Sequence, residues 1–159
     1  MRNFLGKLKN EGKLRLVEPS QAISEAYLQK AGNCLKGAKI LSHASLHENA
    51  IAEAYYAMYN ALQSCLWKCG IRCENHAASI FLVTKLFEKP DLGKRIERAK
   101  KERIDKQYYV TGEMNEPLTG QASDEMILEA EESISEFRVI LQSLDGKAIK
   151  KARDLMKGG

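Results

Sequence analysis

Chemically active side chains are concentrated in residues 53–76, which read EAYYAMYNALQSCLWKCGIRCENH. Cys65 and Cys69 are four residues apart, so in a helix they share one face and two thiolates could reach one metal ion. Gly70 is expected to end that helix before Cys73, and no second ligand pair with the usual zinc spacing follows. We therefore expect the cysteines to be buried core residues, and we predict neither a metal site nor a cofactor.

His76 is the other reactive side chain at the end of this stretch. Cys73 precedes it by three residues, and the two could face each other across a turn, which is the minimum arrangement for an activated thiol. The alternative is that His76 caps a helix or faces solvent, as a single histidine at a helix start more often does. Spacing alone identifies no serine or cysteine nucleophile with a clear base.

Residues 94–106 form the most polar helical segment, with seven basic and three acidic side chains. Such a run usually forms a solvated helix face with ion pairs between residues on neighbouring turns. Arginine beside tyrosine would also suit RNA or a nucleotide, because a guanidinium binds phosphate and an aromatic ring stacks on a base. No glycine-rich phosphate loop is present, so the site would consist of side chains. The candidates are Arg98, Arg103, Asp105 and Tyr108.

The elements that must position these residues are predicted to be helical almost throughout. Apolar residues recur at helical spacing over five segments, about 21–42, 47–69, 75–87, 92–110 and 123–144. Ser20, Asn75 and Ser123 are suitable N-caps for the first, third and fifth segments. The only strand-like piece is KLRLVEPS, at residues 13–20. Short links between the helices predict an all-α fold, an antiparallel up-and-down bundle of four to five helices.

The second helical segment is unusual in carrying three tyrosines. Tyr55 lies on its apolar stripe, and Tyr56 and Tyr59 lie on adjacent faces. One interpretation is a central helix that contacts neighbours on more than one side. The other is a helix at a homodimer interface, where tyrosine is enriched.

Composition indicates one globular domain. The chain has 159 residues, of which 44% are hydrophobic and 29% charged. We predict no membrane span, since no apolar run approaches about 20 residues, and a cytoplasmic location, since no secretory signal is visible. The net charge of +4 is uneven: residues 1–16 carry +4, 145–159 carry +3, and 17–144 carry −3. We expect a basic lead at 1–19, a helical bundle at 20–145 and a basic tail at 146–159, with ends that solubilise the chain or bind nucleic acid.

The order of these features resembles the HEPN family, in particular its small stand-alone prokaryotic branch. The resemblance covers about residues 20 to 145, and its most specific pieces are AYYAMYNAL at 54–62 and ERIDKQYY at 102–109. It implies a bundle of four or five helices, commonly a homodimer. Many members are RNases of toxin–antitoxin or RNA-defence systems, often paired with a minimal nucleotidyltransferase. Other members lack the nuclease residues and are thought to bind RNA or nucleotides.

The nuclease hallmark of the family, an arginine followed a few residues later by a histidine, is degenerate in this chain. Arg103 matches the arginine, but Tyr108 stands where the histidine is expected. Arg72 and His76 form a similar pair, although only three residues separate them and they precede a different helix. A tyrosine, with a pKa near about 10, is a poor base at neutral pH. The motif therefore favours binding over catalysis.

Three functional hypotheses remain open. In the first, the protein binds RNA or a nucleotide through Arg98, Arg103, Asp105 and Tyr108, without cleavage, as part of a pair with a nucleotidyltransferase. In the second, it is a metal-independent RNase toxin in which Arg103 binds the phosphate and His76 acts as acid or base. In the third, it is a helical interaction module with no role in nucleic-acid binding.

Overall fold

The structure, a computed structural model, describes residues 2–108 and 120–158, and the side chains of 3–106 and 120–158. This part of the chain contains seven helices and one two-stranded sheet. In order these are α1 (Arg2–Asn10), β1 (Leu14–Leu16), α2 (Gln21–His43), α3 (His47–Lys68), β2 (Ile71–Cys73), α4 (His76–Phe87), α5 (Pro90–Tyr108), α6 (Gly120–Ser143) and α7 (Gly146–Lys157). The predicted all-α fold is confirmed. None of the described helices is long and apolar enough to cross a membrane.

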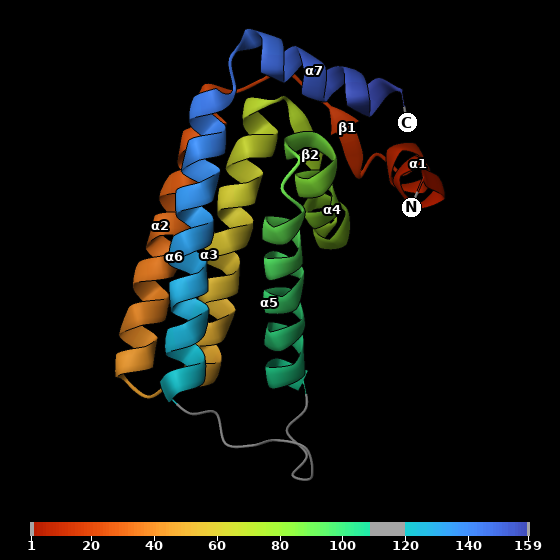
Figure 1. The fold of residues 1–159 in the computed structure, drawn as a ribbon. Helices are drawn as coiled ribbons and strands as arrows, with labels where there is room; N and C mark the ends of the chain where they lie inside the picture. Colours follow the sequence, from red (N-terminus) through yellow and green to blue (C-terminus); the bar gives the residue numbers. More distant parts are fainter. Residues whose placement is uncertain (1, 109–119, 159) are drawn as a thin grey trace.

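The long helices α2, α3, α5 and α6 alternate in direction and form the up-and-down bundle (Figure 1). Helix α3 is the central one: it contacts α2, α4, α5 and α6, and most of its residues are buried. Its buried face includes several alanines, which let neighbouring helices approach closely, at positions Ala50, Ala52, Ala54, Ala57 and Ala61. The interpretation of this tyrosine-bearing helix as a central one is therefore confirmed.

Helix starts follow the local chemistry of the sequence in most cases. The Ser20 side chain accepts a hydrogen bond from the backbone N–H of Ile23, and Asn75 accepts one from Ala78 at 2.9 Å. The predicted cap at Ser123 is wrong, because α6 already begins at Gly120. The Ser123 hydroxyl lies inside the first turn of the helix and donates to the Gly120 carbonyl at 3.0 Å.

A second strand was missed by the sequence prediction. Residues 71–73 pair antiparallel with residues 14–16, with Leu14 opposite Cys73 and Leu16 opposite Ile71. Three residues are too few to show the alternation that identifies a strand, so only the tertiary pairing reveals it. The pairing joins the N-terminal segment to the link between α3 and α4.

Both ends of the described chain pack on the bundle. Leu5 and Leu8 of α1 and Ala152 and Met156 of α7 are buried. Helix α7 lies across one end of the bundle, with α1 beside it (Figure 1). The Lys9 ammonium group donates to the Met156 carbonyl at 2.6 Å. The five helices expected from the sequence thus become seven, because apolar residues in the two basic end segments also form helices with a buried side.

Arg153 of α7 holds the turn between α3 and β2. Its Nη1 donates to the carbonyl oxygens of Val17 at 2.7 Å and of Cys69 and Gly70 at 3.1 Å. Gly70 has φ +67°, the left-handed conformation that favours glycine. This clamp, formed by Arg153 and the three carbonyls, fixes the chain direction just before β2 and therefore before His76.

The Gly70 turn generates a stability prediction. An added Cβ would overlap the Val17 carbonyl and the Arg153 guanidinium and would lie 2.8 Å from the Pro19 nitrogen. Gly70→Ala should therefore lower the free energy of unfolding by more than about 2 kcal/mol, since backbone conformation and contacts are both violated. Gly32→Ala in α2 is the matched control: no atom lies within 4 Å of the added Cβ. It should stabilise the protein by about 0.5–1 kcal/mol. Thermal and urea unfolding followed by circular dichroism measure both, and equal stabilities would contradict the role assigned to the turn.

Candidate functional site

Helices α3, α4 and α5 bring five side chains together. We refer to them as the Tyr–His–Arg cluster: Tyr55, Tyr56 and Tyr59 of α3, His76 at the start of α4, and Arg103 of α5. Tyr55 is fully buried, whereas the other four are half-buried. The cluster is thus an aromatic wall with a histidine and an arginine that reach the surface.

His76 is held on two sides by tyrosines. Its ring stacks on Tyr59, with centroids 3.8 Å apart and planes inclined by 10°. Its Nδ1 lies 2.6 Å from the Tyr55 hydroxyl oxygen. Asn75 caps the helix at the preceding residue and so sets where the ring emerges. This arrangement leaves Nε2 as the nitrogen without a hydrogen-bond partner among the described residues.

The buried polar groups behind the cluster fix the stacking ring. Gln63 donates from Nε2 to the Tyr59 hydroxyl at 2.8 Å and to the Ser79 hydroxyl at 3.1 Å. Gln63 and Ser79 are both buried, so their polar atoms need partners inside the protein. The hydrogen bonds satisfy this need and orient the Tyr59 ring against His76.

The protonation states of this cluster follow from burial and nearby charge. Burial lowers the pKa of His76, and the positive charges of Arg103 and Lys100 lower it further. Burial raises the pKa of Tyr55 and of Tyr59, so both hydroxyls stay protonated at neutral pH. His76 is therefore a neutral imidazole. If Nδ1 donates to Tyr55, Nε2 can accept a proton; if Tyr55 donates to Nδ1, Nε2 carries the hydrogen and can donate to a phosphate oxygen.

Arg103 lies against the aromatic wall. Its Nη1 donates to the Tyr56 hydroxyl at 2.7 Å. Its guanidinium carbon is 5.1 Å from the centroid of the Tyr55 ring and 5.3 Å from that of Tyr56, within the range of cation–π attraction. Arg103 is thus fixed by neutral partners that leave its positive charge in place.

The other arginines of α5 have a different environment. Arg95 pairs with Glu136 of α6 at 2.7 Å, and Arg98 pairs with Glu129 of α6 at 2.5 Å. Among the described residues, Arg103 has no carboxylate within ion-pair distance. Among the described arginines of α5, Arg103 is therefore the one whose charge is held in position by neutral groups and not paired with a described carboxylate.

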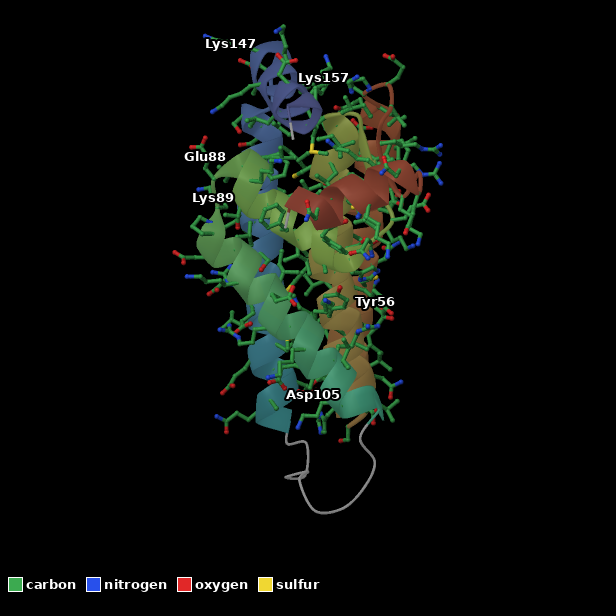
Figure 2. All side chains as sticks on the ribbon, turned by 90° about the vertical axis from the view of Figure 1, so that its right-hand side faces the viewer. Tyr56, Glu88, Lys89, Asp105, Lys147 and Lys157 are labelled. Atoms are coloured by element: carbon green, nitrogen blue, oxygen red, sulfur yellow. The ribbon has the colours of Figure 1, made fainter. Side chains whose placement is uncertain are left out.

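The residues chosen from the sequence are placed unequally. Arg103 and His76 share the cluster, whereas Arg98 faces α6. Asp105 is half-buried. It lies closer than Tyr56 to the end of the bundle at which α5 ends (Figure 2). Two residues along a helix correspond to about 200°, so Asp105 is on the opposite side of α5 from Arg103. Tyr108 ends α5, and its side chain lies outside the described residues.

Four residues of this site were missed by sequence reasoning. The tyrosines were interpreted as packing or dimer-interface residues, and Lys100 was counted among the basic residues of the polar helix. Only the Tyr spacing along α3 was a usable signal, because positions 55 and 59 are about one helical turn apart. Their contact with His76 depends on the turn at Gly70 and on β2, which no local pattern reports.

The geometry of the described residues does not support two alternative sites. The Cys73 thiol donates to the Asn75 carbonyl at 3.5 Å and does not contact His76, so the activated-thiol arrangement is absent from the described residues. His47 Nδ1 lies 3.0 Å from the Ser123 hydroxyl oxygen, but that hydroxyl is fully buried and no substrate can reach it. The described residues also contain no group of three or more His, Cys, Asp or Glu side chains placed to hold a metal ion.

The coupling between Arg103 and His76 gives a prediction for titration. Arg103→Gln removes a positive charge and should raise the pKa of His76, which still stays below about 6.5 because burial, the larger cause, persists. Imidazole NMR signals measured against pH test this, with His76→Gln for assignment. Arg95→Gln, whose charge is paired with Glu136, is the control and should have no effect. An unchanged His76 pKa in Arg103→Gln would contradict the coupling.

The lowered pKa of His76 also predicts how the free energy of unfolding changes with pH. The folded-state pKa of His76 lies below its unfolded value, so the unfolded chain binds the proton more readily. The contribution of neutral His76 to the free energy of unfolding is complete above about pH 6.5. It is lost as the pH falls through that value and then through the lower folded-state pKa. Urea unfolding between these values should therefore be less pH-dependent in His76→Gln than in the wild type.

Comparison with known proteins identifies the family. Residues 24–147 match the model of the HEPN domain, a range that includes α3, α4, α5 and the whole Tyr–His–Arg cluster. No curated protein matches the chain. The resemblance carried by residues 54–62 and 102–109 is thereby confirmed. Since the matched range covers well over half of the chain and contains the bundle that builds the site, the chain belongs to the HEPN domain family.

Proposed function

We propose that the protein binds RNA or a nucleotide at the Tyr–His–Arg cluster, with Arg103 as the main phosphate ligand. The observation that supports this most directly is the environment of Arg103, a guanidinium fixed by Tyr56 and facing no described carboxylate. A guanidinium in that state gains more from a phosphate than an arginine already paired with glutamate. HEPN domains are known as modules related to nucleotides and RNA, which agrees with this site.

The other groups of the cluster fit the same ligand. Lys100 adds positive charge beside His76, and its only ion pair with a described residue, to Glu97 at 3.5 Å, is long. Tyr56 and Tyr59 are half-buried, so part of each ring remains available for a base to stack on. The neutral His76 can donate or accept one hydrogen bond through Nε2. Arginine, lysine and aromatic rings together are the usual elements of single-stranded RNA binding.

RNA cleavage is a second candidate, favoured by the shared position of His76 and Arg103. In this reaction Nε2 of the neutral imidazole takes the proton of a ribose 2′-hydroxyl, and the 2′ oxygen attacks the adjacent phosphorus. The bond to the 5′ oxygen breaks, which gives a 2′,3′-cyclic phosphate and a 5′-hydroxyl that takes its proton from water. The hydroxide that remains takes the proton from the His76 imidazolium, which restores the neutral ring. Arg103 would stabilise the additional negative charge on the phosphorane oxygens. Such a step requires no metal ion.

Homodimer formation, pairing with a nucleotidyltransferase and a role in a toxin–antitoxin or RNA-defence system are part of the proposal. Their support is the family resemblance and the half-exposed tyrosines of α3.

Binding of RNA is the first test. Fluorescence anisotropy with a labelled single-stranded RNA should show binding that weakens with salt, and Arg103→Ala should reduce the affinity about tenfold or more and the salt slope by about one. Arg138→Ala on the exposed side of α6 is the matched control, since it removes the same charge elsewhere. Equal loss in both variants would indicate a nonspecific charge effect and would contradict the proposed site.

Cleavage in EDTA separates the two candidates. Wild type, Arg103→Ala and His76→Ala are incubated with a labelled structured RNA, and the product ends are identified. If the cleavage candidate holds, the wild type forms 2′,3′-cyclic phosphate ends, the His76→Ala rate falls by about 10²-fold or more, and activity rises with pH through the lowered His76 pKa. Binding without such products in the wild type would remove the RNase candidate and leave the binding function.

A further inference from the structure

A groove lies at the other side of α4, away from the Tyr–His–Arg cluster. Helices α1, α4 and α7 enclose it, and its volume is about 1030 Å³. We call it the α4–α7 groove and define it by Leu5, Phe81, Leu155 and the lysines 85 and 147. It shares no residue with the cluster, although both use α4. The proposed function therefore does not account for it.

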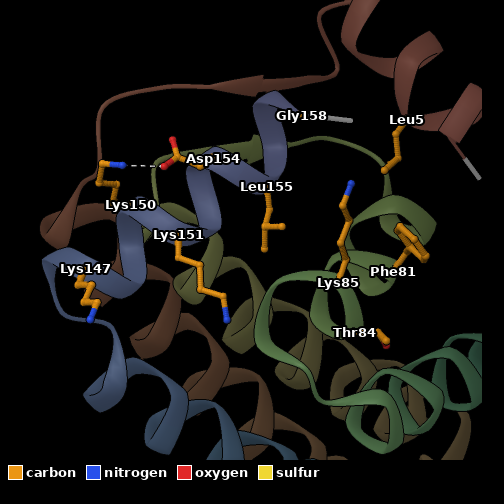
Figure 3. A pocket seen from close by; sticks show the side chains of 10 residues that line it. All are labelled: Leu5, Phe81, Thr84, Lys85, Lys147, Lys150, Lys151, Asp154, Leu155 and Gly158. Carbon is orange, nitrogen blue, oxygen red and sulfur yellow. Dashed lines mark hydrogen bonds and ion pairs between the residues drawn. The ribbon is translucent and has the colours of Figure 1, made fainter.

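Apolar side chains from three separate elements line the groove. Leu5 comes from α1, Phe81 from α4 and Leu155 from α7, and Lys85 rises between Phe81 and Leu155 (Figure 3). Leu155 is 39% exposed, and it gains its interest from lying beside Phe81 and Leu5 in one groove. These residues form an apolar surface. Its contact with water is unfavourable, and its burial under an apolar side chain would be favourable.

The rim of the groove is positive. Four lysines and one aspartate line it. Asp154 is already paired with Lys150 at 2.8 Å, and Lys151 is paired with Glu88 at 3.0 Å. Lys85 and Lys147 have no ion-pair partner among the described residues. Both ammonium groups, that of Lys85 between Phe81 and Leu155 and that of Lys147 near the other lysines of α7, would attract carboxylates.

The combination favours a peptide over a nucleic acid. An RNA backbone needs closely spaced cations and gains little from an apolar surface, whereas two of the four groove lysines are already paired with Asp154 and Glu88. The groove residues include no arginine for bidentate phosphate binding. An amphipathic helix with a stripe of leucines flanked by glutamates would match both the apolar surface and the lysines. We propose that the α4–α7 groove binds an acidic amphipathic segment of a partner protein.

The test uses a labelled amphipathic helical peptide of leucine and glutamate. Fluorescence anisotropy should show that wild type binds it and does not bind a peptide with lysine in place of glutamate. The double variant Lys85→Glu, Lys147→Glu should lose affinity by about tenfold or more, because two attractive charges become repulsive. Leu155→Ser keeps the lysines and should lose affinity by about threefold or more. Lys36→Glu on the exposed side of α2 is the control and should bind as the wild type does.

Distinct outcomes overturn the proposal. The proposal is wrong if the wild type does not bind the acidic peptide, or if the double variant binds it with the same affinity as the wild type. If the double variant lost binding of single-stranded RNA while Arg103→Ala kept it, the groove would be the nucleic-acid surface instead. The lysines are surface residues, so the double variant is expected to fold, and circular dichroism confirms this in each sample. Binding of RNA that depends on Arg103 and not on the groove lysines agrees with both the proposed function and this inference.

Discussion

The turn between α3 and β2 is the constraint on which the rest of the site depends. Gly70 adopts the left-handed conformation, and Arg153 holds its carbonyl and two others. From this point β2 runs only three residues before Asn75 caps α4. The position of His76 against Tyr55 and Tyr59 is therefore set by a backbone clamp that lies outside the cluster.

Within the cluster, a permanently charged arginine lies close to a histidine that is neutral. Arg103 is always protonated, and its presence helps to keep His76 neutral. The rings of Tyr55 and Tyr56 and one hydroxyl group contact the Arg103 guanidinium, and no described carboxylate lies within ion-pair distance of it. A phosphate could therefore bind beside Arg103 and the neutral His76 without first breaking an ion pair between described residues.

Much of the fold was predictable from the sequence, because the helices are long and their apolar residues recur at helical spacing. Ser20 and Asn75 act as the predicted caps. The strand at 71–73 and the packed ends were not predictable, since their stability comes from partners distant in sequence. For the site, His76 and Arg103 were each identified from residue type. Their common position was only one possibility at that stage, because it depends on tertiary contacts that no spacing encodes.

The clamp also imposes an order of assembly on the polypeptide. Arg153 reaches the Val17 carbonyl across 136 residues, and Lys9 reaches Met156 across 147. During synthesis α3, α4 and α5 emerge from the ribosome before α7, so their connecting turn is fixed only after α7 has been made. The reactive side chains are therefore present in the nascent chain before their arrangement is fixed.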